Sequence, residues 1–162
     1  MFKYIKLFFR SLNANAHPGD IAHAVALGFL LALVPKGNLL WIFLFCLVLF
    51  IRVNKGAFFI SLILLSFIVP LADSLLDSIG YAVLSFGPMQ PAYTVLYQTP
   101  FVAFTGFNNT IVAGAFVTGV VLYIPLYFGV KALIVQYRKV LQPKISQSKF
   151  VKFFSSFPLS SK

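Results

Sequence analysis

Three ionisable residues lie within strongly apolar stretches of this 162-residue chain. Lys36 lies in the break Pro35-Lys36-Gly37-Asn38, and Asp73 and Asp77 are one helical turn apart, so they share a face. Charged groups are costly in lipid and usually face a bundle interior or an aqueous cavity. Two hypotheses follow. Either Lys36, Asn38, Asp73 and Asp77 bind an anionic substrate or headgroup, with Lys36 paired to one acid, or Lys36 extends to an interface and both acids lie at the outer surface.

No catalytic or metal-binding motif accompanies these residues. His17 and His23 are the only histidines, and neither has metalloprotease spacing. Asp20 lies one turn before His23, so we expect the imidazole to hydrogen-bond to Asp20 or to water. Cys46 is the only cysteine, which excludes an intrachain disulfide and a cysteine-rich metal site. The sequence therefore predicts no catalytic residue, no metal, no cofactor and no enzyme activity.

The composition places the whole chain in a lipid environment. Hydrophobic residues make up 60% of the chain and charged residues only 10%, against about 45–50% and about 25% in soluble domains. A soluble fold of this size leaves roughly a third of its chain surface exposed, so it would have no place for so much apolar surface. We therefore expect one all-α, polytopic integral membrane domain over residues 1–140, followed by a basic cytoplasmic tail over 141–162.

Residues 20–52 predict a short helical hairpin. Its two arms, at about 21–35 and 39–51, are separated by Pro35 and Gly37, and Asn38 can cap the second arm. Asp20 is expected to cap the first. Each arm is shorter than the roughly 20 residues of a full span. A re-entrant hairpin, which we favour slightly, and two short spans both remain open.

Two longer helices are expected to follow the hairpin. Residues 57–86 predict a transmembrane helix kinked at Pro70. Residues 87–109 contain three prolines and many aromatic residues, which indicates an external connection resting in the interface, with a short helix near 91–104. Residues 111–138 predict a second transmembrane helix, in which 111–130 is uncharged and has the length of a full span. The last two residues before Thr110 are asparagines, and we interpret them as a helix cap.

Small residues recur every fourth position on two of these helices. In lipid, this spacing allows another helix to approach closely. We expect these residues to pack helices together, within the chain, in a homo-oligomer or against another membrane protein. They are Ala24, Gly28, Ala32, Ala115 and Gly119.

The basic residues predict orientation and lipid contacts. The chain carries 13 Lys and Arg residues against three acids, for a formal charge of +10. Residues 1–12 place apolar and basic residues on opposite sides of an amphipathic interfacial helix. Lys and Arg flank the apolar segments, and such loops stay in the cytoplasm, so both termini are expected there. The expected partners are membrane lipids, with anionic headgroups at the basic termini, and not nucleic acid.

The order of these features over residues 17–56 resembles a bacterial family known as domain of unknown function 2062. The resemblance rests on an ordered set of residues: Pro18, Ile21-Ala22, Ala26 with Gly28, Pro35 with Gly37, and Arg52 with Asn54. The family's usual Asn-Pro-x-Thr-rich stretch is absent, and only Pro70 followed by Asp73 stands near its place. The chain thus looks like a divergent branch. The resemblance implies a multi-pass protein of the bacterial inner membrane and carries no catalytic residue across.

Two functions from different classes fit these features. The first is a non-enzymatic membrane scaffold or subunit of a membrane complex. The second is a small transporter or lipid-handling protein for an anionic solute or headgroup, which would use Lys36 with Asp73 or Asp77. The surroundings of Lys36 discriminate between them: burial beside an acid favours transport, and exposure favours the scaffold.

Overall fold

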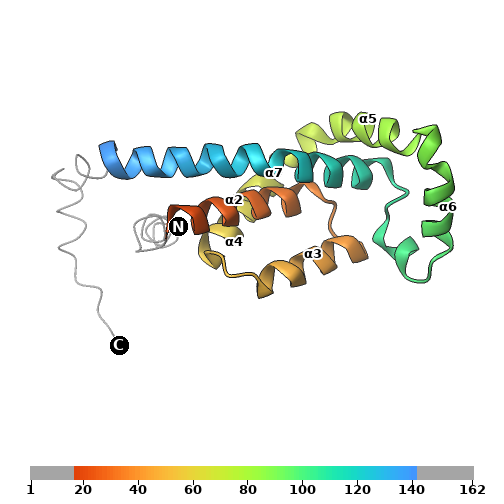
Figure 1. Cartoon of the computed structure of the whole chain (residues 1–162), viewed down its shortest axis with the longest axis horizontal. Coiled ribbons are helices and arrows are strands. Elements are labelled where there is room, and N and C mark those ends of the chain that lie inside the picture. The colour runs from red at the N-terminus through yellow and green to blue at the C-terminus, as the bar shows by residue number, and fades with distance from the viewer. Residues whose placement is uncertain (1–16, 142–162) are drawn as a thin grey trace.

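A computed structural model describes residues 17–141, which fold into helices joined by turns (Figure 1). The expected interfacial helix at 1–12 and the tail beyond residue 141 lie outside these residues. The six α-helices are α2 (Pro18–Leu33), α3 (Leu39–Phe50), α4 (Lys55–Ser66), α5 (Asp73–Leu84), α6 (Gln90–Gln98) and α7 (Thr110–Gln136). Single turns of tighter or wider helix are η1 (Val69–Ala72), η2 (Gly87–Met89), η3 (Val102–Thr105) and η4 (Tyr137–Leu141). The all-α expectation is confirmed over this range.

Helix α2 begins earlier than the sequence suggested. His17 is its N-cap, and its Nδ1 atom accepts a hydrogen bond from the backbone N–H of Gly19 at 3.2 Å. Pro18 takes the first helical position, where its fixed φ and missing N–H cost nothing. The expectation that Asp20 caps this helix is therefore wrong. Asp20 lies within the first turn, where its charge favours the positive end of the helix.

Helix α3 is fixed at both ends by polar side chains. At its start, Asn38 Oδ1 accepts a hydrogen bond from the N–H of Trp41 at 2.7 Å, and Asn38 Nδ2 donates to the carbonyl of Pro35 at 3.0 Å. At its end, the amine of Lys55 donates to three backbone carbonyls, those of Val48, Leu49 and Ile51, at 2.6–2.9 Å. An α-helix leaves its last four carbonyls without intrahelical donors, so one lysine satisfies most of this end.

The expected long helix at 57–86 is broken near Pro70. Helix α4 ends at Ser66, and the segment Val69–Leu84 continues at an angle of 54° to it. Proline lacks an N–H and its ring clashes with the preceding turn, which accounts for the break. The kink expected at Pro70 is thus a bend between two helices of 12 residues each, α4 and α5.

Helix α7 is the longest element and begins at Thr110, with Asn109 as its N-cap. Together with η4 it forms one helical stretch, Thr110–Lys139, that is long and apolar enough to cross a membrane. The bent pair of α4 with η1 and α5 would make a second span if it counts as one. Helices α2 and α3 are apolar but shorter than a full span.

Helix α2 lies at the centre of the packed helices and runs antiparallel to α7 (Figure 1). His23 contacts Tyr123, Leu30 lies beside Gly119, and Val34 shares a cluster with Ala115. This antiparallel register defines two ends. The turn end contains the α2–α3 turn and the start of α7. The basic end contains the start of α2, the α3–α4 connection and the last turns of α7.

Candidate functional site

Lys36 lies at the turn end with its side chain exposed. Gly37 next to it has φ +97°, a left-handed conformation that glycine adopts without strain. A Cβ atom on Gly106 would lie 3.7 Å from Cβ of Asn38. Since Gly106 belongs to the connection just before α7, the tip of the hairpin reaches the level at which α7 begins.

Asp73 and Asp77 lie at the same end but do not meet Lys36. Asp77 is exposed and accepts a hydrogen bond from the hydroxyl of Thr110, the first residue of α7. Asp73 is half-buried in the first turn of α5, where its charge favours the helix N-terminus. Within residues 17–141, Lys36 forms no ion pair with either acid. The structure thus brings the four predicted binding residues to one end of the molecule without joining them into one site.

The small residues of α2 pack against α4. Ala24, Gly28 and Ala32 are buried, and Gly28 is the closest point of this contact. A Cβ atom on Gly28 would overlap Ser61 Oγ and would lie 3.0 Å from the carbonyl oxygen of Phe58. The partner of this face, which the sequence left open, is therefore another helix of the same chain.

The small residues of α7 pack against α2. Ala115 is fully buried in a cluster with Leu33 and Val34. A Cβ atom on Gly119 would lie 3.0 Å from Cγ of Leu30. Both small-residue faces are thus occupied within the described residues, and neither is available for a second chain.

A close contact between α5 and α7 involves two glycines that the sequence reasoning missed. A Cβ atom on Gly80 of α5 would overlap the carbonyl oxygen of Thr110, and one on Gly114 of α7 would overlap that of Leu76. The same Cβ atom on Gly114 would lie only 2.8 Å from the backbone nitrogen of Gly80, so the two backbones touch. Gly114 between two alanines is a local signal for such a contact, but nothing in the sequence names Gly80 as its partner.

His23 has a different partner from the one expected. Its Nδ1 atom lies 2.8 Å from the hydroxyl of Tyr123, and its ring stacks on Tyr127 with centroids 4.1 Å apart. Asp20 does not bond to it, so the prediction of Asp20 as its partner is wrong. The imidazole is thus satisfied by the hydroxyl of Tyr123, 100 residues away, and by the ring of Tyr127. The amine of Lys131 also lies over the ring of Tyr127, 5.6 Å from its centroid. The cluster fastens α2 to α7 at the basic end.

Titratable residues do not converge on a reaction centre in the part of the chain that the structure describes. His, Cys, Asp and Glu side chains form no group of three that would hold a metal ion between residues 17 and 141. Cys46 is exposed on α3, away from any histidine contact described above. The polar side chains instead cap helices or join pairs of helices.

Apolar side chains dominate the exposed surface. On α3, Val48 is the only buried residue, while Phe43 is 60% exposed and Phe50 89% exposed. Large apolar residues are also exposed on α4, α5 and α7. In water, contiguous apolar surface of this extent marks a contact with a membrane or another protein.

The comparisons with known proteins agree with the resemblance and extend it. The model of a family described as "Uncharacterized protein conserved in bacteria (DUF2062)" matches residues 2–141, far more than the 17–56 expected. An uncharacterized protein of Treponema pallidum (strain Nichols) is 42% identical over 159 residues, covering 98% of each chain. No solved structure matches the chain.

Proposed function

We propose that this chain, which belongs to the bacterial DUF2062 family, is a non-enzymatic scaffold embedded in the inner membrane. The observation that carries the proposal is helix α3. It is apolar on every side, seven of its twelve residues are exposed, and Asn38 and Lys55 fix its two ends. A rigid apolar helix of this kind suits contact with a transmembrane helix of another membrane protein.

The charge distribution supports membrane insertion with a defined orientation. Six Lys and Arg residues lie within residues 17–141, and only Lys36 lies at the turn end. The other five lie at the basic end: Arg52, Lys55, Lys131, Arg138 and Lys139. Loops rich in Lys and Arg remain in the cytoplasm. We therefore place the basic end in the cytoplasm and the turn end at the outer face.

The antiparallel alignment of α2 with α7 indicates how far the hairpin extends across the membrane. From Thr110, the 20 uncharged residues of a full span end at about Val130. Helix α2 lies along α7 from Ala115 to Tyr127, and the tip of the hairpin, at Asn38, reaches Gly106. The hairpin therefore covers nearly the whole depth that α7 crosses, which supports two short spans over a re-entrant loop.

The surroundings of Lys36 favour a scaffold over transport. Transport of an anion through this chain would need the lysine at membrane depth, paired with an acid or facing a cavity. Lys36 is exposed at the end of the hairpin, and Asp77 is bonded to Thr110 instead. This position suits an amine in the outer headgroup layer.

Cys46 allows a direct test, because it is the only cysteine and lies exposed on α3. A photo-crosslinker on Cys46 in isolated membranes should give one protein adduct of discrete mass, and oxidation to a disulfide dimer would identify that partner as a second copy. The control moves the cysteine to exposed Leu75 on α5, in a Cys46→Ser chain, and should give lipid adducts only.

Equal adducts from both positions, or no protein adduct from Cys46, would contradict the scaffold. So would anion flux in reconstituted vesicles that is lost in both Lys36→Ala and Asp73→Asn. A Lys36→Cys chain, also in the Cys46→Ser background, tests the orientation. An impermeant maleimide should label it from outside the cell, and protection there would place the tip inside the bilayer or the cytoplasm.

A further inference from the structure

The last turns of α7 extend past the start of α2 at the basic end (Figure 1). Gly19, near the start of α2, faces the hydroxyl of Tyr127, and Ile134 is still buried in the cluster that contains Ile21. The turns after Ile134 project beyond the packed helices. If α7 enters the hydrocarbon at about Thr110, it leaves it near Val130, about 30 Å further along. The projecting turns then lie in the cytoplasmic headgroup layer.

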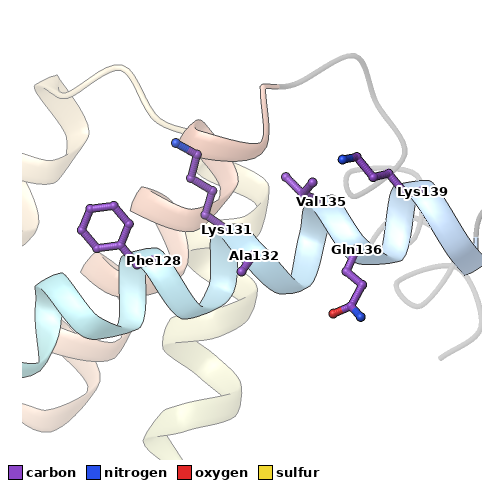
Figure 2. A pocket seen from close by; sticks show the side chains of 6 residues that line it. All are labelled: Phe128, Lys131, Ala132, Val135, Gln136 and Lys139. Atoms are coloured by element: carbon purple, nitrogen blue, oxygen red, sulfur yellow. The ribbon is translucent and has the colours of Figure 1, made fainter.

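A shallow groove of about 510 Å³ lies along the end of α7 and is lined by five residues of α7 and by Lys139 of η4. Figure 2 shows Phe128, Lys131, Val135 and Lys139 on one side of the helix, with both lysine side chains projecting from that side. Their spacing of three, four and four residues keeps them on one face. The Cα atoms of the two lysines are about 12 Å apart along the axis, so their flexible side chains can approach one bound group from both ends.

The lining combines cations with apolar surface and contains no acid. Phe128, Ala132 and Val135 supply the apolar part, and Lys131 and Lys139 supply the charge. Lys139 is exposed, and Lys131 is held over the ring of Tyr127. A free phosphate would satisfy the amines alone, whereas a phospholipid also covers the exposed apolar side chains beside them.

We propose that this face of α7 binds an anionic phospholipid of the cytoplasmic leaflet, with its phosphate between Lys131 and Lys139 and an acyl chain along Phe128 and Val135. The inference rests on the proposed membrane insertion and adds a specific lipid partner to it. Basic pockets on the cytoplasmic side of transmembrane helices recognise anionic headgroups in this way.

Native mass spectrometry of the full chain tests the proposal, after equilibration with equimolar phosphatidylglycerol and phosphatidylcholine. The wild-type chain should retain phosphatidylglycerol preferentially. Lys131→Gln and Lys139→Gln should each lower that preference by about fivefold, since a lysine near an anionic surface contributes about 1 kcal/mol. The matched control is Lys36→Gln, which removes the same charge at the turn end and should leave the preference unchanged.

Three outcomes would overturn the lipid site. The double variant could retain the wild-type preference, Lys36→Gln could lower it equally, or inorganic phosphate at millimolar concentration could abolish it, which would indicate a free-phosphate site. Resistance of the chain to alkaline extraction from membranes separates the two proposals. A resistant chain without lipid preference refutes only the lipid site, and an extracted chain refutes membrane insertion as well.

Discussion

The helices α2, α4, α5 and α7 form a packed block, whereas helix α3 stands outside it, although both regions are strongly apolar. In the block, glycines bring backbones into contact at Gly28 and at the Gly80–Gly114 crossing. Helix α3 has no glycine or alanine, and large side chains cover its surface. Two caps and the hydrogen bond from Trp41 Nε1 to the carbonyl of Leu31, at 3.1 Å, hold it, together with side-chain packing of Val48 and Leu44 against the core.

The difference shows that apolarity and burial are separate properties in this chain. Lipid solvates a leucine as well as a protein interior does, so hydrophobicity alone does not drive two helices together in a bilayer. Small residues do, because they let many backbone and side-chain atoms reach van der Waals distance. Helix α2 is buried because it is rich in small residues, and α3 is exposed because it lacks them.

The largest expected effect comes from adding a methyl group where α5 meets α7. Gly114→Ala places a Cβ atom on the carbonyl oxygen of Leu76, and backbone cannot move aside as a side chain can. We expect a loss of about 3 kcal/mol or more in the free energy of unfolding. Thermal unfolding in detergent, followed by the fluorescence of the single tryptophan, measures it.

The matched control lies on the same helix. A Cβ atom on Gly129 would have no neighbouring atom within 4 Å, so Gly129→Ala should stabilise the chain by about 0.5–1 kcal/mol through the helix propensity of alanine. If both variants unfold at similar temperatures, the glycine contact does not hold the block together.

A smaller effect is expected at the crossing of α2 and α4. Gly28→Ala overlaps the hydroxyl of Ser61, and we expect a cost of about 1–3 kcal/mol. Ser61→Ala removes that oxygen and should recover part of the loss. Recovery stays partial, because the carbonyl of Phe58 remains 3.0 Å from the new Cβ atom. An identical loss in the presence and absence of Ser61→Ala would place the clash elsewhere.

The smallest effect is expected in α3, where it should remain local. Lys55→Met removes three hydrogen bonds to the last carbonyls of α3, for a cost of about 1–2 kcal/mol. Because the lost hydrogen bonds all lie at one end of α3, faster amide exchange at residues 47–51 should appear with little change in the melting temperature. Arg52→Met removes an exposed charge nearby and should leave exchange unchanged. Equal exchange in the two variants would mean that charge, and not capping, holds this end.

Local chemistry was predictable from the sequence, and partners were not. Proline and glycine marked the break at 35–37, and Asn38 lies at the cap position that its residue type favours. The error at Asp20 arose because Pro18 fits the first helical position, which moved the cap to His17. The Asn38 cap and the His17 cap both follow rules that act within one turn of helix.

Contacts between distant segments followed no such local rule. The chain separates Gly80 from Gly114 by 34 residues and His23 from Tyr123 by 100, and many small or aromatic residues would satisfy either pattern equally well. The binding residues at the turn end show the same limit. Their residue types predicted an attraction between Lys36 and the two acids. In the structure, Asp77 instead accepts a hydrogen bond from Thr110 at the start of α7.

The Gly80–Gly114 contact also determines how displacement travels through the molecule. Backbone against backbone leaves no rotamer that can change to absorb a shift, and close-packed interiors transmit strain. A tilt of α7, imposed at its projecting cytoplasmic end, would therefore move α5 together with α7 as one rigid unit. Helix α3 meets the rest through side chains instead, among them Trp41, Leu44 and Val48. Side chains can change rotamer, so this contact should absorb part of a shift that the glycine contact would transmit.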